Sequence, residues 1–124
     1  PYSKIGHLDG ELFRAARLVV DTGIHALGWS RQQAIDYLNT NTINPPHDNE
    51  VEIDRYIMWP GQALGYKIGQ LKIKALREKA EKALGPKFDL RKFHNAVIDN
   101  GGLPLDTLEA QIDRWIELQM PPKQ

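Results

Sequence analysis

Residues 8–27 read LDGELFRAARLVVDTGIHAL, a run whose apolar side chains cover most of a helical wheel. From position 14 onward its ionisable residues recur every three or four positions, at Arg14, Arg17, Asp21 and His25. At 100° per residue these four side chains occupy a sector of about 80°, so they form one polar stripe along the helix. The pattern predicts a helix that is almost entirely buried, with further helices packed around it.

A second helix follows after a tight turn. Gly28 is placed to end the first helix, because glycine readily adopts the left-handed conformation that closes many helices. Ser30 and Gln33 have the spacing of a capping box, which predicts a helix through about Leu38. Residues 39–49 then collect Asn, Thr, Asp and two prolines, residues that favour turns and disfavour helix. We predict a loop of about ten residues there, long enough to be functional.

Helical spacing resumes at Glu50 and continues to Trp59. Pro60 ends or bends that helix, because proline disfavours the helical conformation in the residue before it. Proline also suits the first position of a helix, so the next helix is predicted from Pro60 to about Leu84, where a Gly-Pro pair ends it.

This long helix has two halves of different character. Its first half carries Gly61, Gly65 and Gly69 at intervals of four. Because a glycine in a helix costs about 1 kcal/mol relative to alanine, the spacing indicates that other atoms approach this face closely. From Lys72 to Lys82 the sequence is mostly charged, which predicts a helix facing solvent.

Two shorter helices complete the pattern. Asp89 is placed to cap a helix to about Asp99, and Gly101-Gly102 ends it. The last helix has apolar residues at helical spacing: Leu105, Leu108, Ile112, Trp115 and Ile116. Pro121-Pro122 is expected to end the structure. With no alternating strand pattern and no internal repeat, the sequence predicts an all-α fold of about five or six helices.

Composition limits the size and the partners of the protein. The 124 residues are expected to form a single helical segment over residues 1–124. Because the chain begins Pro-Tyr-Ser rather than with Met, we expect it to be processed, trimmed or cut from something larger. Sixteen basic residues balance sixteen acidic ones, which argues against a nucleic-acid partner. There is no cysteine for disulfides or thiolate metal sites, and no apolar run approaches the about 20 residues of a membrane-spanning helix.

The polar stripe is the first candidate for chemistry. Asp21 lies one turn before His25 and can orient its imidazole, and an arginine such as Arg17 binds carboxylates bidentately. The alternative is that the stripe is only a solvent-facing edge, or a set of ion pairs that satisfies itself. Metal binding by Asp21 and His25 alone is a weaker interpretation. Catalytic zinc needs three protein ligands, and the other histidines, at His7, His47 and His94, have no ligand spacing.

The second candidate is residues 50–70, EVEIDRYIMWPGQALGYKIGQ. Arg55 and Tyr56 precede the Pro-Gly break, and Gln62 and Tyr66 follow it, so these side chains can line a cleft in which a tyrosine hydroxyl donates to a developing oxyanion. In the alternative, both tyrosines are core residues and Arg55 is a surface ion-pair partner. The pattern does not decide between them. Because no GxSxG, HExxH or phosphate-binding glycine motif occurs, residue chemistry alone indicates an incomplete enzyme or none.

Three long runs together resemble one bacterial family over nearly the whole chain. They are RAARLVVDTGIHALGWSRQQAIDYL (residues 14–38), EIDRYIMWPGQALGYKIGQLKIKALREKA (52–80) and FDLRKFHNAVIDNGGLPLDTLE (88–109). They look like the C-terminal part of the domain-of-unknown-function family numbered eight-eight-five. Its members are several times longer, mostly helical and often exported as lipoproteins. They resemble gluzincin-type zinc metallopeptidases through an upstream HExxPGH-like motif, which is absent here.

The resemblance extends to individual residues. Arg17, Asp21, His25 and Trp29 match the family stretch RLVVDTGIHxxGW, and Arg55, Tyr56, Pro60, Gly61, Gln62 and Tyr66 match RYxxxPGQAxxYxxG. Helical carboxypeptidases and dipeptidases of the same superfamily bring an Arg-Tyr or His-Tyr element from late in the chain to the zinc. By that analogy the resemblance implies Tyr56, or else Tyr66, as oxyanion donor. The resemblance also implies a catalytic His25 that Asp21 orients, and Arg55 or Arg17 as the clamp for a substrate carboxylate. The residues expected to contact the substrate are Arg17, Asp21, Arg55 and Gln62.

The resemblance also implies partners and a location. The chain is expected to pack against the N-terminal part of the same protein, which would supply the zinc ligands and the catalytic Glu. In the complete protein it would contact a peptide substrate, and by itself it would be inactive. The complete protein is expected in the periplasm or attached to the membrane by a lipid anchor. The apolar first helix of the chain is expected to expose a patch through which the isolated chain can form a homodimer. The rival interpretation is a non-catalytic helical module for packing or protein interaction.

Overall fold

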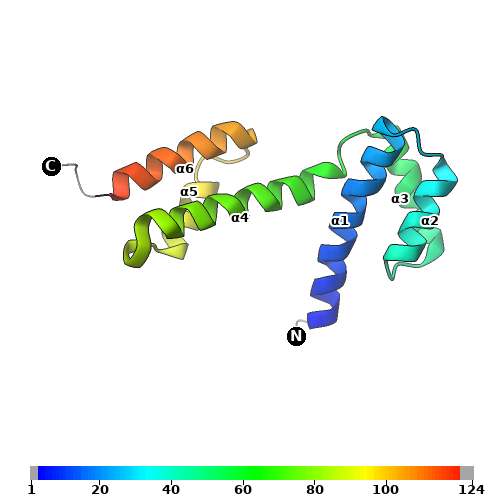
Figure 1. Cartoon of the computed structure of the whole chain (residues 1–124), viewed down its shortest axis with the longest axis horizontal. Coiled ribbons are helices and arrows are strands. Elements are labelled where there is room, and N and C mark those ends of the chain that lie inside the picture. The colour runs from blue at the N-terminus through cyan, green and yellow to red at the C-terminus, as the bar shows by residue number, and fades with distance from the viewer. Residues whose placement is uncertain (1–2, 121–124) are drawn as a thin grey trace. The chain divides into compact units, whose positions relative to one another are not determined.

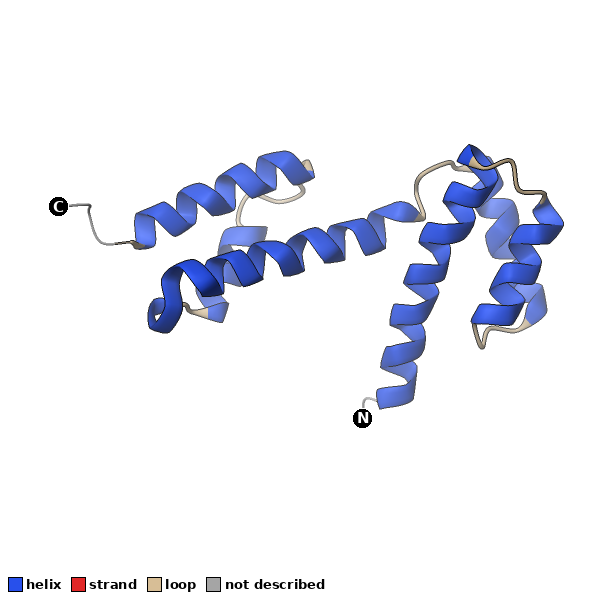
Figure 2. Cartoon of the chain, viewed as in Figure 1, coloured by secondary structure: helices blue, strands red, loops and turns tan. Residues whose placement is uncertain are grey.

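The computed structural model describes residues 3–120, which contain six α-helices, one short 3-10 helix and no strand (Figure 2). The elements are α1 (Lys4–Ala26), α2 (Arg31–Asn41), α3 (Pro46–Met58), α4 (Leu64–Leu84), η1 (Gly85–Lys87), α5 (Leu90–Ile98) and α6 (Leu105–Gln119). The predicted all-α fold is confirmed. The chain divides into two units, with the boundary between Ile68 and Gly69 inside α4.

The first unit is built from α1, α2 and α3, which lie side by side around one core (Figure 1). That core consists of Ala16, Val20, Ala34, Ile35, Leu38, Ile53, Tyr56 and Ala63, with Ile24, Trp29 and Tyr37 packed against it. Because α1 supplies both core residues and the polar stripe, its packing decides where the stripe faces.

The predicted helix ends of this unit are confirmed where a side chain or a glycine defines them. Ser30 and Gln33 form the full capping box at the start of α2. Gly28 has a φ of +70°, in the left-handed region that allows the chain to turn directly from α1 to α2. The start of α1 differs from the prediction, because the Ser3 hydroxyl accepts a hydrogen bond from the Gly6 amide and the helix begins at Lys4.

The predicted loop over residues 39–49 is mostly helical, so that prediction is wrong. Only residues 42–45 separate α2 from α3. Pro46 occupies the first turn of α3, where a missing amide hydrogen has no helical partner to lose. The fully buried Asn49 side chain donates to Asn39 Oδ1 over 2.9 Å, which ties the two helices together across the short connection.

The break between α3 and α4 also differs from the prediction. Helix α4 begins at Leu64 rather than at Pro60, and residues 59–63 form turns. Gly61 has a φ of +81°, a conformation that other residues rarely adopt, and this stops the helix from resuming directly after Pro60.

Two expectations about packing are wrong within the described residues. Helix α1 is not almost entirely buried: Ile5, Leu8 and Leu12 are exposed, Leu8 by 67%. No atom lies within 4 Å of the positions that a Cβ would take at Gly65 or Gly69, so nothing in this part of the chain uses the glycine face. The exposed end of α1 agrees with the expected apolar patch.

The second unit packs the C-terminal part of α4 against α5 and α6. Its core is formed by Leu76, Ala80, Leu84, Phe93, Leu108, Ile112 and Ile116. Asp89 caps α5 as predicted, accepting hydrogen bonds from the Arg91 and Lys92 amides. Helix α4 ends at Leu84 before the Gly-Pro pair, also as predicted. The expected stop at Pro121-Pro122 lies outside the described residues.

Candidate functional site

The stripe residue Arg17 is the most unusual side chain of the first unit. It is only 8% exposed, and its guanidinium lies over three aromatic rings, with the Arg17 Cζ 4.3 Å from the ring centre of Tyr66, 5.4 Å from that of Tyr56 and 5.6 Å from that of Phe13. Its buried Nε has no hydrogen-bond partner. Among residues 3–120 no carboxylate forms an ion pair with it. A buried cation without an anion is costly, so Arg17 has unused capacity for a negatively charged group.

Asp21, one turn further along α1, is committed to the chain itself. It is 2% exposed, and each of its carboxylate oxygens lies 3.1 Å from the Gly61 amide nitrogen, which donates to both. Asp21 therefore holds α1 against the turn between α3 and α4.

His25 is exposed, and its Nε2 lies 3.0 Å from the backbone oxygen of Tyr56. A carbonyl oxygen only accepts, so Nε2 carries the hydrogen and Nδ1 keeps its lone pair when the ring is neutral. The expectation that Asp21 orients His25 is wrong, because the backbone of Tyr56 does so while Asp21 binds Gly61.

Tyr56 is buried, and its hydroxyl donates to Glu52 Oε2. Burial, followed by this bond, raises the pKa of the Tyr56 hydroxyl well above its usual value. Arg55 also binds Glu52, with its Nη2 2.7 Å from Oε2. Burial alone would raise the pKa of Glu52, but the hydrogen bonds from Arg55 and Tyr56 lower it below the usual range.

Gln62 and Tyr66 complete the cluster beyond the break. Gln62 Oε1 accepts from Arg55 Nη1 over 2.8 Å and from Arg17 Nη2 over 3.4 Å. Tyr66 is 46% exposed. A hydrogen bond with Gln62, followed by the charge of Arg17, lowers the pKa of the Tyr66 hydroxyl. Of the two tyrosines, Tyr66 is the exposed one, because Tyr56 is only 1% exposed.

The structure thus brings both predicted groups of residues together around one place. Arg17, Asp21 and His25 of α1 each contact a residue from the end of α3, the turn or the start of α4. Arg14 is the exception, because it is exposed and donates to the Gly10 carbonyl on its own helix. Sequence reasoning missed Glu52, although its spacing of three and four residues before Arg55 and Tyr56 was a usable signal.

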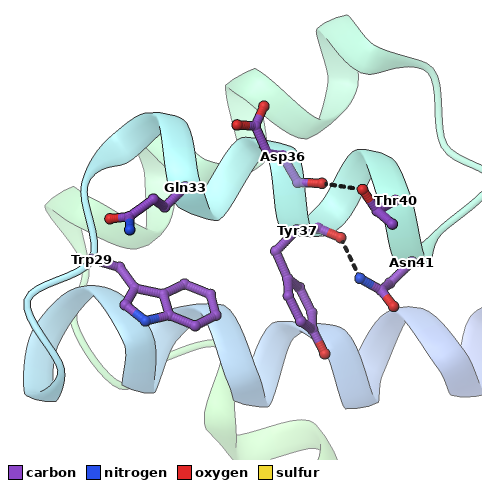
Figure 3. A pocket seen from close by; sticks show the side chains of 6 residues that line it. All are labelled: Trp29, Gln33, Asp36, Tyr37, Thr40 and Asn41. Atoms are coloured by element: carbon purple, nitrogen blue, oxygen red, sulfur yellow. Dashed lines mark hydrogen bonds between the residues drawn. The ribbon is translucent and has the colours of Figure 1, made fainter.

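A separate hollow lies beside α2 and is lined by Trp29, Gln33, Asp36, Tyr37, Thr40 and Asn41 (Figure 3). The Trp29 and Tyr37 rings lie 5.6 Å apart, and the hydrogen bonds drawn there stay within α2. Of the residues matched to the family stretches it contains only Trp29, so we do not assign it to the candidate site.

Metal ligands are not gathered anywhere in the described part of the chain. No three His, Asp or Glu side chains within residues 3–120 are placed to hold one ion. The residues present therefore do not fit a zinc centre, which normally takes three or four protein ligands. In the same range, no helix has the length and apolar character needed to cross a membrane.

Comparison with known proteins gives a family and a related structure. The family model "Bacterial protein of unknown function (DUF885)" matches residues 1–112. A crystal structure of the "putative lipoprotein from Colwellia psychrerythraea" is 51% identical in sequence and superposes with a TM-score of 0.90 over 92% of this chain. The chain spans 20% of the length of that protein. No curated protein matches.

Proposed function

This chain belongs to the bacterial family of unknown function DUF885, whose model matches residues 1–112, and we propose a role for it on that basis. We propose that the chain forms one wall of a peptidase active-site cleft in a longer protein. The parent would be a zinc-dependent enzyme of the carboxypeptidase or dipeptidase type, and the chain by itself would be inactive. The observation that carries this proposal is the buried guanidinium of Arg17, which forms no ion pair within residues 3–120, beside the partly exposed Tyr66.

Arg17 is the better candidate for clamping a substrate carboxylate. The charge of Arg55 is already balanced by an ion pair with Glu52 over 2.7 Å, whereas Arg17 forms no ion pair and lies against the neutral Gln62 oxygen and aromatic rings. A planar carboxylate fits a guanidinium with two parallel hydrogen bonds. Arg55 then acts by holding Gln62 and Glu52 in place rather than by binding the substrate.

Tyr66 is the better candidate for donating to an oxyanion. The Tyr56 hydroxyl already donates its hydrogen bond to Glu52, and Tyr56 is only 1% exposed. The lowered pKa of the Tyr66 hydroxyl makes it a stronger donor to negative charge. Tyr56 stays in the proposal as the second candidate and as a wall of the Arg17 pocket.

His25 can take part in proton transfer through Nδ1. Its Nε2 is held by the Tyr56 backbone, which fixes the ring and leaves Nδ1 as the nitrogen that can accept a proton or a hydrogen bond. Asp21 contributes indirectly, because its bond to Gly61 holds α1 beside the turn that carries Gln62.

The zinc of this proposal must be bound elsewhere in the parent, since the described residues of this chain offer no ligand set. The N-terminal part of the parent is the proposed source of the ligands and of the catalytic Glu. It is also the proposed partner of the exposed end of α1, where Ile5, Leu8 and Leu12 lie. By analogy with the Colwellia protein, we place the parent in the periplasm or on a lipid anchor.

A non-catalytic helical module is the second candidate, and specific contacts favour it. Asp21, Arg55 and Tyr56 all have partners within the chain, as expected of side chains that only hold helices together. On this reading, the exposed apolar end of α1 would bind another protein or a second copy of the chain.

The deciding experiment measures zinc content and peptide hydrolysis in the full-length parent, beside the 124-residue chain under the same conditions. The proposal expects bound zinc and turnover in the parent and neither in the chain. A parent without zinc or turnover would favour the helical module. Turnover by the chain alone would overturn the proposed division of the active site.

A further inference from the structure

The hollow beside α2 contains none of the residues that surround Arg17, and the proposed peptidase chemistry does not use it (Figure 3). Its volume is about 460 Å³. Two aromatic rings, those of Trp29 and Tyr37, line it together with four polar side chains of α2. Both the volume and the combination of aromatic and polar groups are typical of small-molecule sites.

The Trp29 ring has one face closed by α1 and the other turned to the hollow. A Cβ added at Gly23 would lie within 3.0 Å of three ring carbons at once, as an atom over the face of the ring would. Trp29 is nevertheless only partly buried and lines the hollow, so its other face borders that space. The indole is therefore a flat apolar surface that is supported from behind.

Tyr37 extends this surface. The centres of the Trp29 and Tyr37 rings are 5.6 Å apart and the rings are tilted by 49°, so they contact each other directly. A ligand therefore has no room between the two rings and must lie against them. This arrangement differs from an aromatic cage, in which several rings surround an ammonium group.

The polar groups around these rings include both donors and acceptors. Gln33 Oε1 accepts from the Ser30 amide over 2.8 Å in the capping box, so its Nε2, with two hydrogens to donate, is the end left for a ligand. Asn41 Nδ2 donates to the Tyr37 carbonyl over 2.8 Å, which leaves its Oδ1 as an acceptor. The hollow thus suits a ligand whose own groups both donate and accept.

The charge of the hollow disfavours anions. Among its lining residues, all of which belong to the described chain, Asp36 alone is charged. One Asp36 oxygen accepts from Gln32 Nε2 over 2.8 Å, and the other is left as an acceptor. A carboxylate repels a phosphate or carboxylate ligand, whereas a neutral ligand with hydroxyl groups meets no such repulsion.

We infer that this hollow binds a neutral carbohydrate, with the C–H face of one sugar ring stacked on Trp29 and its hydroxyl groups bonded to Gln33, Asp36 and Asn41. A pyranose ring has both surfaces that the hollow requires. One face presents C–H groups to an aromatic ring, and the hydroxyl groups at its edge both donate and accept. The inference is independent of the proposed peptidase activity, because the two sites share no residue.

The test is an NMR titration of the ¹⁵N-labelled 124-residue chain with the methyl β-glycosides of glucose, galactose and N-acetylglucosamine. The Trp29 indole N–H signal is identified by its loss in Trp29→Phe, and that of Trp59 by its loss in Trp59→Phe. At least one glycoside should shift the Trp29 signal with a Kd of about 1 mM. The signal of Trp59, which is 60% exposed and does not line the hollow, should not move.

A variant of the polar groups tests the hydrogen bonds. Asn41→Leu removes one acceptor, so the Kd of that glycoside should rise about threefold or more. The matched control is Asn95→Leu, at an exposed asparagine of α5, and it should leave the Kd unchanged. If circular dichroism shows that Asn41→Leu loses helix, Asp36→Ala serves instead, with the same rise expected. An unchanged Kd in the folded variant would overturn the inference.

Three further results would also overturn it. The first is a Trp29 signal that none of the three glycosides shifts. The second is an equal shift of the Trp59 signal, which would show contact with any exposed indole rather than binding in the hollow. The third is a Trp29 signal that tetramethylammonium shifts and the glycosides do not, which would identify a site for organic cations.

Discussion

A Cβ added at Gly23 would lie 2.5 Å from two ring carbons of Trp29, closer than real side chains approach. The Trp29 indole thus packs directly against Gly23 on α1, and the Gly23 carbonyl also accepts a hydrogen bond from the Trp29 amide over 2.9 Å. The DTGIHALGW stretch therefore has a structural explanation: one glycine makes room for the tryptophan that follows the turn at Gly28.

Gly23→Ala should lower the free energy of unfolding by about 1–3 kcal/mol, because the Trp29 ring must move out of a packed position. Gly69→Ala is the matched control. No atom lies within 4 Å of its added Cβ, so the better helix propensity of alanine should stabilise the chain by up to about 1 kcal/mol. Urea unfolding of both variants, followed by circular dichroism, measures the difference. Equal changes in the free energy of unfolding for the two variants would mean that the Trp29 ring does not pack against Gly23.

Arg17→Met should change the free energy of unfolding by less than about 1 kcal/mol. The variant loses attraction to three aromatic rings but also removes a buried charge that has no anionic partner. If the polar stripe were instead a set of ion pairs holding the helices together, breaking it should cost about 3 kcal/mol or more. Chemical denaturation therefore separates a residue kept for a ligand from one kept for the fold.

Tyr66→Phe in the full-length parent should lower turnover by about 10²-fold with little change in KM, as for the loss of one oxyanion donor. Tyr56→Phe should act mainly on stability, because Glu52 loses a partly buried donor. Steady-state kinetics and thermal unfolding of both variants test this assignment. A large loss of turnover in a stable Tyr56→Phe variant would instead identify Tyr56 as the oxyanion donor.

Acid should destabilise the first unit partly through Glu52. Its pKa in the folded chain lies below the ordinary value of 4.5, so the unfolded chain binds the proton first as the pH falls. The stabilisation is present above about pH 4.5 and is lost as the pH drops through the folded pKa. Unfolding curves between pH 3 and 7 should therefore show a smaller acid effect in Glu52→Gln. Glu50→Gln, at an exposed position on the same helix, should keep the full acid effect.

The sequence allowed prediction of features that depend on neighbouring residues. Capping by Ser30 and Asp89 and the turn at Gly28 follow from local backbone geometry, and all three are confirmed. The predicted loop over residues 39–49 failed because tertiary contacts of Asn49 compensate for weak helix propensity. The start of α4 was misplaced because Pro60 carries a helix-start signal, whereas the φ of Gly61 depends on how the chain folds back.

The candidate site was predictable as a group of residues but not as a set of bonds. Helical spacing showed that Arg17, Asp21 and His25 share one face of α1. It could not show that Asp21 binds Gly61, 40 residues away, rather than its neighbour His25. Which tyrosine is the better oxyanion donor likewise depends on burial and on the hydrogen bond between Tyr56 and Glu52. Spacing along the sequence does not show which of two tyrosines on different helices is the more buried.

The bond from Gly61 to Asp21 turns a single backbone hydrogen into a reporter of the whole site. This amide belongs to no helix, and both of its acceptors are oxygens of a buried carboxylate on α1. It can exchange with deuterium only when α1 and the turn separate, the motion that would also part Arg17 from Gln62. The exchange rate of the Gly61 amide thus reports how often the contacts between α1 and the turn open. A ligand that bridges Arg17 and Tyr66 should slow that rate.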